Sequence, residues 1–329
     1  MSVIQVSNLK KRFNLEAGFF ARFGRYVYAV NDVSFSIGLN ETYGLVGESG
    51  CGKTTTARLL VRMYEADSGD ILFQDTANVR DMGKRELKRY REKVKYVFQD
   101  PARSLNPRMS IREVLLSGYR WSSLWPGRQE ALREAAAIME EVGMTPADLE
   151  RRPAEFSGGQ RQRISIARGL LMQPDLLICD EVVSALDVSI QGQILNLLLD
   201  IRKRRNLSFL FIAHDLKVAC YFCDRIGVMY RGELMEEAPA AELYRTAKHP
   251  YTKRLFSSAA YGLDAGTVSG GIIQGEADTR TTADGSGGSG CCSFADRCPL
   301  AGQECFTEHP EMREITPGVP SHKVRCIKA

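Results

Sequence analysis

The sequence predicts an α/β fold in which helices cover both faces of a mainly parallel sheet. Largely apolar runs at 42–46, 176–179 and 208–213 alternate along the chain with segments of helical apolar spacing, such as 190–204. Strands that are apolar at every position are buried on both faces, which is typical of parallel sheets. With 329 residues, the chain is long enough for such a domain and an appendage.

Further elements are expected around these runs. An alternating stretch at 4–9 predicts an edge strand, and 27–37 predicts a second strand. The character of the chain changes over about 101–160, where helical spacing recurs at 111–116 and 128–142 between prolines and glycines. We expect this part to be a helical subdomain inserted between strands of the core.

A second region follows the core. We expect a core domain over residues 1–237 and a C-terminal extension over 238–329. Gly, Ser, Thr, Ala and Asp dominate about 262–290, which predicts a flexible linker. The cysteine motif that follows, 291–326, is too short to build an apolar core of its own without a staple.

The cysteines of this small extension predict a metal site. Four thiolates can bind either an iron–sulfur cluster or zinc, and the spacing leaves both open. A reducing cytosol would favour metal ligation over structural disulfides for this chain. The four candidate ligands are Cys292, Cys298, Cys305 and Cys326.

Composition indicates a soluble globular protein. A hydrophobic content of 44%, a charged content of 26% and a net charge of +4 are ordinary, and the charge neither indicates nor excludes a nucleic-acid partner. The chain has no run of eighteen apolar residues, and its N-terminus lacks the features of a signal peptide. We therefore expect a cytosolic location, where any membrane role depends on a partner that spans the bilayer.

A glycine-rich loop follows the apolar run 42–46. Gly47 and Gly52-Lys53-Thr54 fit the pattern G-x-x-x-x-G-K-[ST] of phosphate-binding loops. Glycines let successive N–H groups point at phosphates, and the following helix N-terminus adds its dipole. Lys53 can reach the β- and γ-phosphates, and the Thr54 hydroxyl can bind Mg²⁺. The predicted nucleotide-binding residues of this phosphate loop are Gly47, Ser49, Gly50, Cys51, Gly52, Lys53, Thr54 and Thr55.

Two carboxylates end the apolar run 176–179. In a parallel α/β sheet, the functional edge is formed by the carboxyl ends of the strands. Asp180 is therefore a predicted Mg²⁺ ligand opposite Thr54. Glu181 is the predicted base that orients and deprotonates the attacking water. A charged turn is the alternative, and the upstream phosphate loop disfavours it.

A second anion site is predicted at Ser157-Gly158-Gly159-Gln160. The Ser hydroxyl, free backbone N–H groups and the positive end of the following helix favour an anion there. An ordinary Ser N-cap would explain the helix start but not Gly-Gly-Gln. Because the helical subdomain separates the two anion sites in sequence, we expect a head-to-tail pair of chains, in which the Ser157 loop of each serves the phosphate loop of the other.

Together these motifs resemble the ATP-binding subunit of an ATP-binding cassette (ABC) transporter over about 1–237. The resemblance rests on the phosphate loop, Gln99, the Ser157–Gln160 motif, Asp180-Glu181, Ser184-Ala185-Leu186-Asp187 and His214, in that order. It implies an ATPase with the core of a P-loop nucleotide hydrolase, and ATP and Mg²⁺ as its ligands.

The resemblance also assigns roles to single residues. Phe13 would stack on adenine, and Gln99 would link Mg²⁺ and the attacking water to the helical subdomain. Asp187 would reach across the dimer to the phosphate loop of the other chain. His214 would sense the γ-phosphate, although a lone histidine is more often structural.

Finer similarity points to the oligopeptide, dipeptide and nickel importers. It rests on Gln99-Asp100-Pro101 with Ser104-Leu105-Asn106-Pro107, the run 183–189, His249-Pro250-Tyr251-Thr252 and the terminal cysteines. Val182 departs from the small residue or proline common in these proteins, but both carboxylates remain. The similarity implies import of peptides or a related small solute, and it favours a [4Fe–4S] cluster, with Zn²⁺ or free thiols as the alternatives.

The same similarity implies a set of partners. These are a homologous second ABC ATPase subunit, two transmembrane permease subunits and, indirectly, an extracytoplasmic solute-binding protein, with no nucleic acid. The chain would then lie at the cytoplasmic face of the inner or plasma membrane as a peripheral subunit. An exporter ATPase and a DNA-repair-type machine are the alternatives; the cysteine tail disfavours the first, and the absence of a long coiled-coil insertion in the sequence disfavours the second.

Two further expectations concern Cys51 and the aromatic insert. Cys51 lies in the phosphate loop near a helix N-terminus, which predicts a lowered pKa and inhibition of the ATPase by thiol alkylation. The aromatic and basic insert at 18–26 is consistent with a hairpin tip that packs on its own domain, or with a patch that contacts lipid headgroups or a partner.

Overall fold

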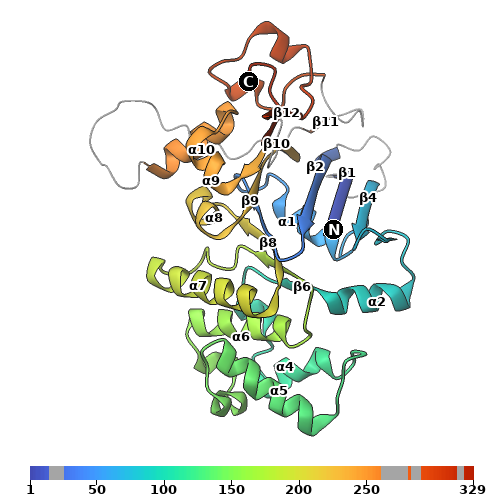
Figure 1. Ribbon diagram of the computed structural model, residues 1–329, viewed down its shortest axis with the longest axis vertical. Helices are drawn as coiled ribbons and strands as arrows, with labels where there is room; N and C mark the ends of the chain where they lie inside the picture. Colours follow the sequence, from blue (N-terminus) through green and yellow to red (C-terminus); the bar gives the residue numbers. More distant parts are fainter. Residues whose placement is uncertain (15–25, 261–280, 283–289, 317–321) are drawn as a thin grey trace. The chain divides into compact units, whose positions relative to one another are not determined.

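The computed structural model describes residues 1–14, 26–260, 281–282, 290–316 and 322–329. The chain divides into two compact units. Figure 1 labels helices and strands of both. Unit 1 comprises Met1–Val3, Ile37–Glu41 and Asp81–Ile212, and unit 2 comprises Ile4–Ser36, Thr42–Arg80 and Ala213–Ala329. Most of the aromatic insert and most of the expected linker lie outside the described residues.

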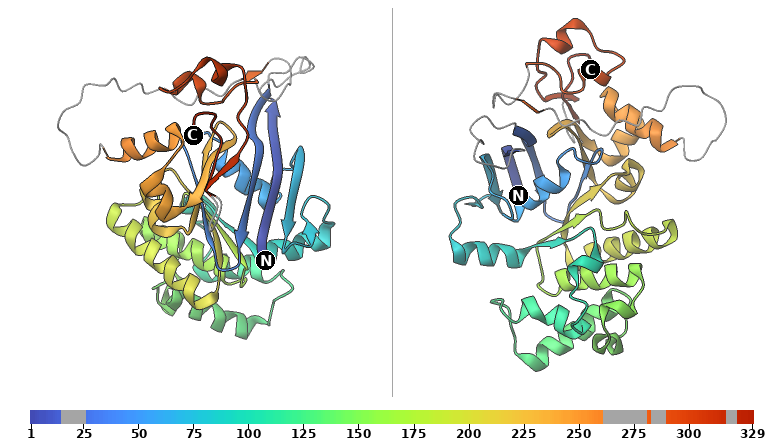
Figure 2. Two further views of the ribbon diagram at one scale, coloured as in Figure 1. Left: turned by 45° about the horizontal axis from the view of Figure 1, so that its top comes forward. Right: turned by 180° about the vertical axis from the view of Figure 1, so that it is seen from behind.

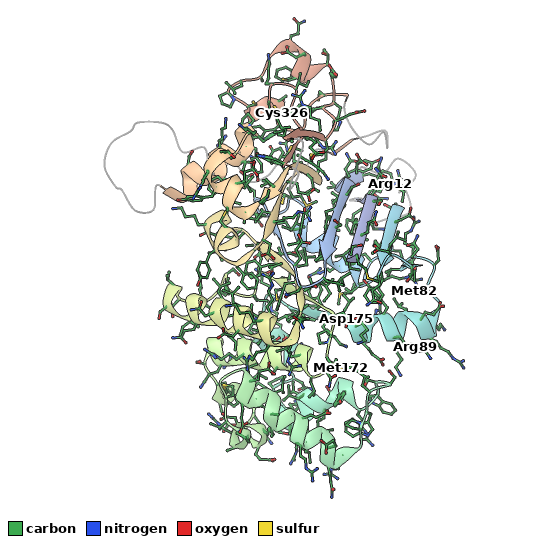
Figure 3. The ribbon with its side chains drawn as sticks, viewed as in Figure 1. Arg12, Met82, Arg89, Met172, Asp175 and Cys326 are labelled. Carbon is green, nitrogen blue, oxygen red and sulfur yellow. The ribbon has the colours of Figure 1, made fainter. Side chains whose placement is uncertain are left out.

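Unit 1 contains three parallel strands. β7 (Leu176–Asp180) is flanked by β6 (Val94–Val97) and β8 (Ser208–Ala213), with Leu176 opposite Val94 on one side and Ser208 on the other. Every residue of β7 and β8 is buried, as their almost entirely apolar sequences predict. Asp175, labelled in Figure 3, immediately precedes β7 and pairs with Lys93 just before β6 at 3.3 Å.

The helices of unit 1 include the predicted helical subdomain. Its α4 and α5 both contact α6, and α5 buries residues at helical spacing, among them Ala131, Ala135 and Ile138. α4 begins at a capping box in which Ser110 and Glu113 accept from each other's backbone N–H groups. The helices are α2 (Lys84–Lys93), α3 (Pro101–Ser104), α4 (Ile111–Tyr119), α5 (Arg128–Glu141), α6 (Gly158–Leu170) and α7 (Val188–Arg205).

Unit 2 contains a five-stranded sheet in the order β11-β2-β1-β4-β5. β1 and β2 are long, and the left view of Figure 2 shows them side by side with β4. β4 pairs antiparallel with both β1 and β5. The strands are β1 (Ser2–Asn14), β2 (Tyr26–Gly38), β4 (Ser68–Phe73), β5 (Ala77–Asn78) and β11 (Thr281–Thr282).

A second set of strands in unit 2 has the order β12-β13-β10-β9-β3. β3 pairs parallel with β9, whereas β9, β10, β13 and β12 pair antiparallel in turn. These strands are β3 (Thr42–Val46), β9 (Arg225–Tyr230), β10 (Glu233–Pro239), β12 (Arg313–Thr316) and β13 (His322–Val324). The helices of this unit are α1 (Lys53–Leu60), α8 (Leu216–Phe222), α9 (Ala240–Thr246) and α10 (Pro250–Ala260).

The predicted α/β class is confirmed, but the prediction of a mainly parallel sheet is confirmed only in part. Parallel and antiparallel pairing both occur, so the sheets are mixed. β10 was not predicted from the sequence. Three of its buried residues are glutamates (Glu233, Glu236 and Glu237), so the segment does not show the apolar pattern of a buried strand. None of the helices in the described ranges combines the length and the hydropathy that a membrane crossing requires.

Candidate active site

The phosphate loop joins β3 to α1, and two of its glycines cannot be replaced without a clash. A Cβ on Gly47 would lie 2.1 Å from the Met229 carbonyl oxygen. Gly52 has φ +111°, and a Cβ there would lie 2.0 Å from the Ala29 carbonyl oxygen. The loop backbone is therefore packed directly against neighbouring backbone, which fixes its path before the helix begins.

Lys53, the first residue of α1, lies inside this loop. It is 4% exposed, and its Nζ donates to the carbonyl oxygens of Gly47 at 2.7 Å and Glu48 at 2.9 Å. The ammonium group is thus held over the turn whose N–H groups are predicted to bind phosphates. Thr54 and Thr55 follow on the first turn of α1 and are half-buried, whereas Ser49 and Gly50 are exposed at the tip of the loop.

The expected acidity of Cys51 is wrong. Its side chain is 2% exposed, and burial raises its pKa above the ordinary thiol value, although Lys53 acts in the opposite direction. The expectation assumed that the helix N-terminus dominates. Burial opposes the thiolate more strongly, because a buried charge loses its hydration.

The carboxylates at the end of β7 have different surroundings. Asp180 is 2% exposed and accepts a short hydrogen bond from the Tyr96 hydroxyl. Glu181 is half-buried and accepts a hydrogen bond from the Gln99 amide at 2.7 Å. Glu181 also has φ +49°, a left-handed conformation that is uncommon for a residue other than glycine. Gln99, Asp180 and Glu181 are thereby brought together within unit 1.

The Ser157 loop forms a capping box at the start of α6. The Ser157 hydroxyl accepts from the Gln160 N–H at 3.3 Å, and the Gln160 side chain accepts from the Ser157 N–H at 2.9 Å. Ser157, Gly158 and Gln160 are exposed, and Gly159 is half-buried. Because the N-terminus of α6 is exposed, its positive dipole end can face an anion supplied from outside the chain.

The remaining predicted residues are distributed over the two units. Asp187 is exposed and precedes α7 in unit 1 without capping it through its side chain. Phe13, near the end of β1 in unit 2, is half-buried, with its ring edge-on to Tyr64 at 5.4 Å. His214 is exposed directly after β8.

The four predicted cysteine ligands lie near one another in unit 2. Cys292, Cys305 and Cys326 are buried, Cys298 is half-buried, and Cys326 is labelled in Figure 3. Burial raises the pKa of Cys292 to about 11, and the other three thiols add to this effect. Within the described ranges, however, no three His, Cys, Asp or Glu side chains are arranged so that they could hold a metal ion.

Sequence reasoning missed two tyrosines that support the site. Tyr96 donates to Asp180, and the Tyr251 hydroxyl accepts from the Glu48 N–H of the phosphate loop at 3.0 Å. Tyr251 belongs to the His249-Pro250-Tyr251-Thr252 motif, which indicated only a subfamily. The motif was the signal from which the role of Tyr251 could have been predicted. Its contact with the phosphate loop was not predicted, because Glu48 and Tyr251 are 203 positions apart in the sequence.

Known proteins with similar sequences are ABC ATPases. A family model described as ABC transporter matches residues 30–184, and one described as Oligopeptide/dipeptide transporter, C-terminal region, matches residues 235–305. The oligopeptide transport ATP-binding protein AppF of Bacillus subtilis is 41% identical over 99% of this chain and 97% of its own length. The oligopeptide transport ATP-binding protein OppF of the same organism is 45% identical over 78% of this chain and 82% of its own length.

Solved structures agree with this assignment. A dimeric ATP-binding cassette in a post-hydrolysis state with ADP and phosphate aligns with a TM-score of 0.63 and 25% identity, over 72% of this chain and 98% of its own. CbiO1 of Clostridium perfringens, at 22% identity and a TM-score of 0.64 over 80% of this chain and 96% of its own, has the same fold. Given its glycine-constrained phosphate loop, its paired carboxylates and relatives that match it over almost its whole length, the chain belongs to the ABC transporter family and is an ABC ATPase.

Proposed function

We propose that this chain is the ATP-hydrolysing subunit that powers import of peptides, or of a related small solute, through an ABC transporter. The observation that carries the proposal is the hydrogen bond between Gln99 and Glu181 beside Asp180, in a chain that also has an intact phosphate loop. The relatives named for oligopeptide transport and the match to the C-terminal region of such transporters support peptides as the solute.

Each predicted residue then has a role in ATP hydrolysis. Glycine N–H groups of the phosphate loop and Lys53 bind the phosphates, and Phe13 stacks on adenine. Thr54, Gln99 and Asp180 would hold Mg²⁺, and the ion would neutralise charge on the phosphate oxygens. Glu181 accepts a proton from the attacking water, and its hydrogen bond to Gln99 fixes the direction in which its carboxylate points.

A second ATPase subunit completes the site. The exposed Ser157–Gln160 turn and Asp187 of one chain serve the ATP held by the phosphate loop of the other, and His214 contacts the γ-phosphate. Hydrolysis removes these contacts, so the closed dimer loses the interactions that favour it and opens. The subfamily similarity favours a homologous, non-identical chain as the partner.

The chain acts with membrane subunits. Two permease subunits would span the bilayer, with a solute-binding protein on the far side. We place the ATPase at the cytoplasmic face, where the helical subdomain transmits the motion to the permeases. Within this proposal, we divide the chain at residue 237 into the ATPase domain and a C-terminal extension that carries the cysteine motif.

The cysteine extension is proposed to bind a [4Fe–4S] cluster through Cys292, Cys298, Cys305 and Cys326, with Zn²⁺ as the alternative. The proximity of four thiols, three of them buried, suits a site with four sulfur ligands. The described side chains do not converge as a ligand set around one point. Closure around a cluster would therefore require the thiols to deprotonate and turn inward.

The substitution Glu181→Gln tests the catalytic assignment. Glutamine preserves size and hydrogen bonding to Gln99 but cannot take a proton from water, so ATPase activity should fall about 10²–10⁴-fold while ATP binding persists. ATP should then trap a stable dimer with the partner subunit, measured by size-exclusion chromatography with light scattering. The matched control is Glu65→Gln, which alters a glutamate whose side chain is 85% exposed.

Two outcomes would contradict the proposal. Turnover that survives Glu181→Gln would exclude Glu181 as the base. If vesicles reconstituted with the permeases moved peptide away from the ATPase side when ATP was added to that side, the direction assigned here would be wrong and the exporter alternative correct.

A further inference from the structure

We propose that Arg297 is a positioning residue of the ATP site. From the cysteine segment, defined here as the described residues 290–316 and 322–329, its guanidinium holds Glu48 and thereby the phosphate loop. The inference rests on the proposed role of that loop in binding ATP. It assigns to the cysteine segment a direct part in nucleotide affinity.

The contact between the two residues is bidentate. Nη1 of Arg297 lies 2.9 Å from Oε2 of Glu48, and Nη2 lies 3.1 Å from Oε1. The two side chains are only 25% and 28% exposed, so solvent screens the pair less than it would at the surface. Two parallel charge-assisted hydrogen bonds fix orientation as well as distance, which a single contact does not.

Glu48 transmits this restraint to the rest of the loop. It directly follows Gly47, and its backbone carbonyl accepts from Lys53 Nζ at 2.9 Å. Its backbone N–H donates to the Tyr251 hydroxyl at 3.0 Å. One residue thus connects the loop's lysine, a fully buried tyrosine and Arg297.

Arg297 is itself held in place by its neighbours. It ends a short 3₁₀ turn (Ala295–Arg297), and the preceding Phe294 is 1% exposed. Phe294 packs edge-on against Tyr230 at 5.2 Å and lies 5.4 Å from Tyr251. The guanidinium of Arg297 also lies over the Tyr230 ring at 5.7 Å. These aromatic contacts hold the turn and the guanidinium of Arg297 in place. Arg297 therefore loses little further side-chain entropy when it binds Glu48.

Charge explains why such a partner is needed. Glu48 puts a carboxylate into a loop that must accept a polyphosphate, and like charges repel. Arg297 neutralises it. Loss of Arg297 alone leaves the Glu48 carboxylate without its positive partner, so it repels the phosphates of ATP. Loss of both side chains removes the carboxylate as well, and the repulsion disappears with it. The single arginine variant should therefore be more impaired than the double variant.

The test measures MgATP affinity of the full-length chain by isothermal titration calorimetry, using Glu181→Gln as the background in every sample. Arg297→Ala should weaken binding about ten-fold. Arg297→Lys should recover part of the loss, and Glu48→Ala/Arg297→Ala should bind more tightly than Arg297→Ala alone. The control is Asp296→Asn, which perturbs the same turn at its 3.8 Å pair with Arg231 and should leave affinity unchanged.

A second measurement separates positioning from folding. In the complex with its partner and an intact Glu181, Arg297→Ala should raise KM for ATP and change kcat less than about two-fold. Equal affinities of Arg297→Ala and the parent would overturn the proposal, as would additive losses in the double variant or an equal loss in Asp296→Asn. A parent chain that bound no MgATP would instead overturn the proposed function, and this inference with it.

Discussion

At the residue scale, the backbone of Glu181 departs from ordinary geometry at the position where the chemistry is expected. Its left-handed φ of +49° is retained although no glycine is present. Its N–H donates to the Ile212 carbonyl at 3.1 Å and its carboxylate accepts from Gln99, so neighbouring groups hold the residue from both ends. Strain that surrounding contacts maintain at a candidate base is consistent with a preorganised catalytic residue.

Cys51 permits a prediction at the same scale. Because burial both raises its pKa and blocks access, a thiol-alkylating reagent at neutral pH should modify Cys51 at least about 100-fold more slowly in the folded chain than in denaturant. Mass spectrometry of the peptide that contains Cys51, over a time course, measures the ratio. Equal rates in the two states would mean that the thiol is accessible and that the loop is not packed as described.

At the scale of elements, β13 attaches the C-terminal segment to β10 through buried polar groups. His322 is fully buried, and its Nε2 lies 2.7 Å from Oε1 of Glu236, while its Nδ1 lies 3.3 Å from Oε1 of Glu242. The hydrogen bond to Glu236 raises the pKa of His322. Protonated histidine would then link two carboxylates on β10 and α9. Hydrogen bonds to charged groups of this kind contribute about 1.5–3 kcal/mol.

This arrangement predicts a specific dependence of stability on pH. Since the folded pKa of His322 is above its unfolded value of 6.5, its contribution is fully present below about pH 6.5 and is lost as pH rises through the folded pKa. The difference in Tm between the parent chain and His322→Asn should therefore be largest in mild acid and shrink toward alkaline pH. Differential scanning fluorimetry over a range of about 3.5 pH units, from about pH 5.5 to about pH 9, measures this difference in Tm.

His249 should show the opposite dependence of stability on pH and serves as a control for His322. Burial lowers its pKa to about 4, and its Nδ1 accepts from the Tyr251 N–H at 3.0 Å, as a neutral ring must. Its contribution is present above about pH 6.5 and is lost as pH falls toward its folded pKa. His249→Asn should thus lose its stability difference from the parent in acid. The same trend in both variants would show that one of the two histidines does not titrate as assigned.

At the scale of the whole molecule, the cysteine segment is continuous with the ATPase core of unit 2. β13 extends the strand set at β10, and Arg325 donates to the Leu234 carbonyl at 3.0 Å. A partly buried network joins Glu233 of β10 to His309 and Ser293. The segment therefore does not depend on its own small core, as a free appendage of that length would.

Metal content tests the proposed cluster at this scale. Full-length protein purified without oxygen should contain about four iron atoms per chain, or about one zinc if the alternative holds. Cys305→Ser should lose the metal and lower Tm, because one of four ligands and a buried thiol are removed together. Elemental analysis by mass spectrometry decides the matter. Metal-free parent protein with an unchanged Tm in Cys305→Ser would refute the site.

Much of the fold followed from local pattern. The buried runs that became β3, β7 and β8 are apolar at almost every position, and α5 shows regular helical spacing, so both types could be identified directly. β10 and β13 could not, because their glutamate and histidine are buried only through partners distant in sequence. Sequence periodicity reports the polarity of a residue but not whether a distant group neutralises it.

The sequence by itself determined that this protein is an ABC ATPase: the phosphate loop, the Ser157–Gln160 motif and the two carboxylates at a strand end occur in the chain order of that family. These motifs can be recognised from residue type and spacing, because each depends on the local geometry of residues that are close in the sequence. Only the tertiary structure decided that burial makes Cys51 a weak acid and that Arg297 reaches Glu48 across 249 positions. Burial and long-range pairing depend on how segments distant in the sequence pack together, and the spacing of residues within a short motif does not reveal that packing.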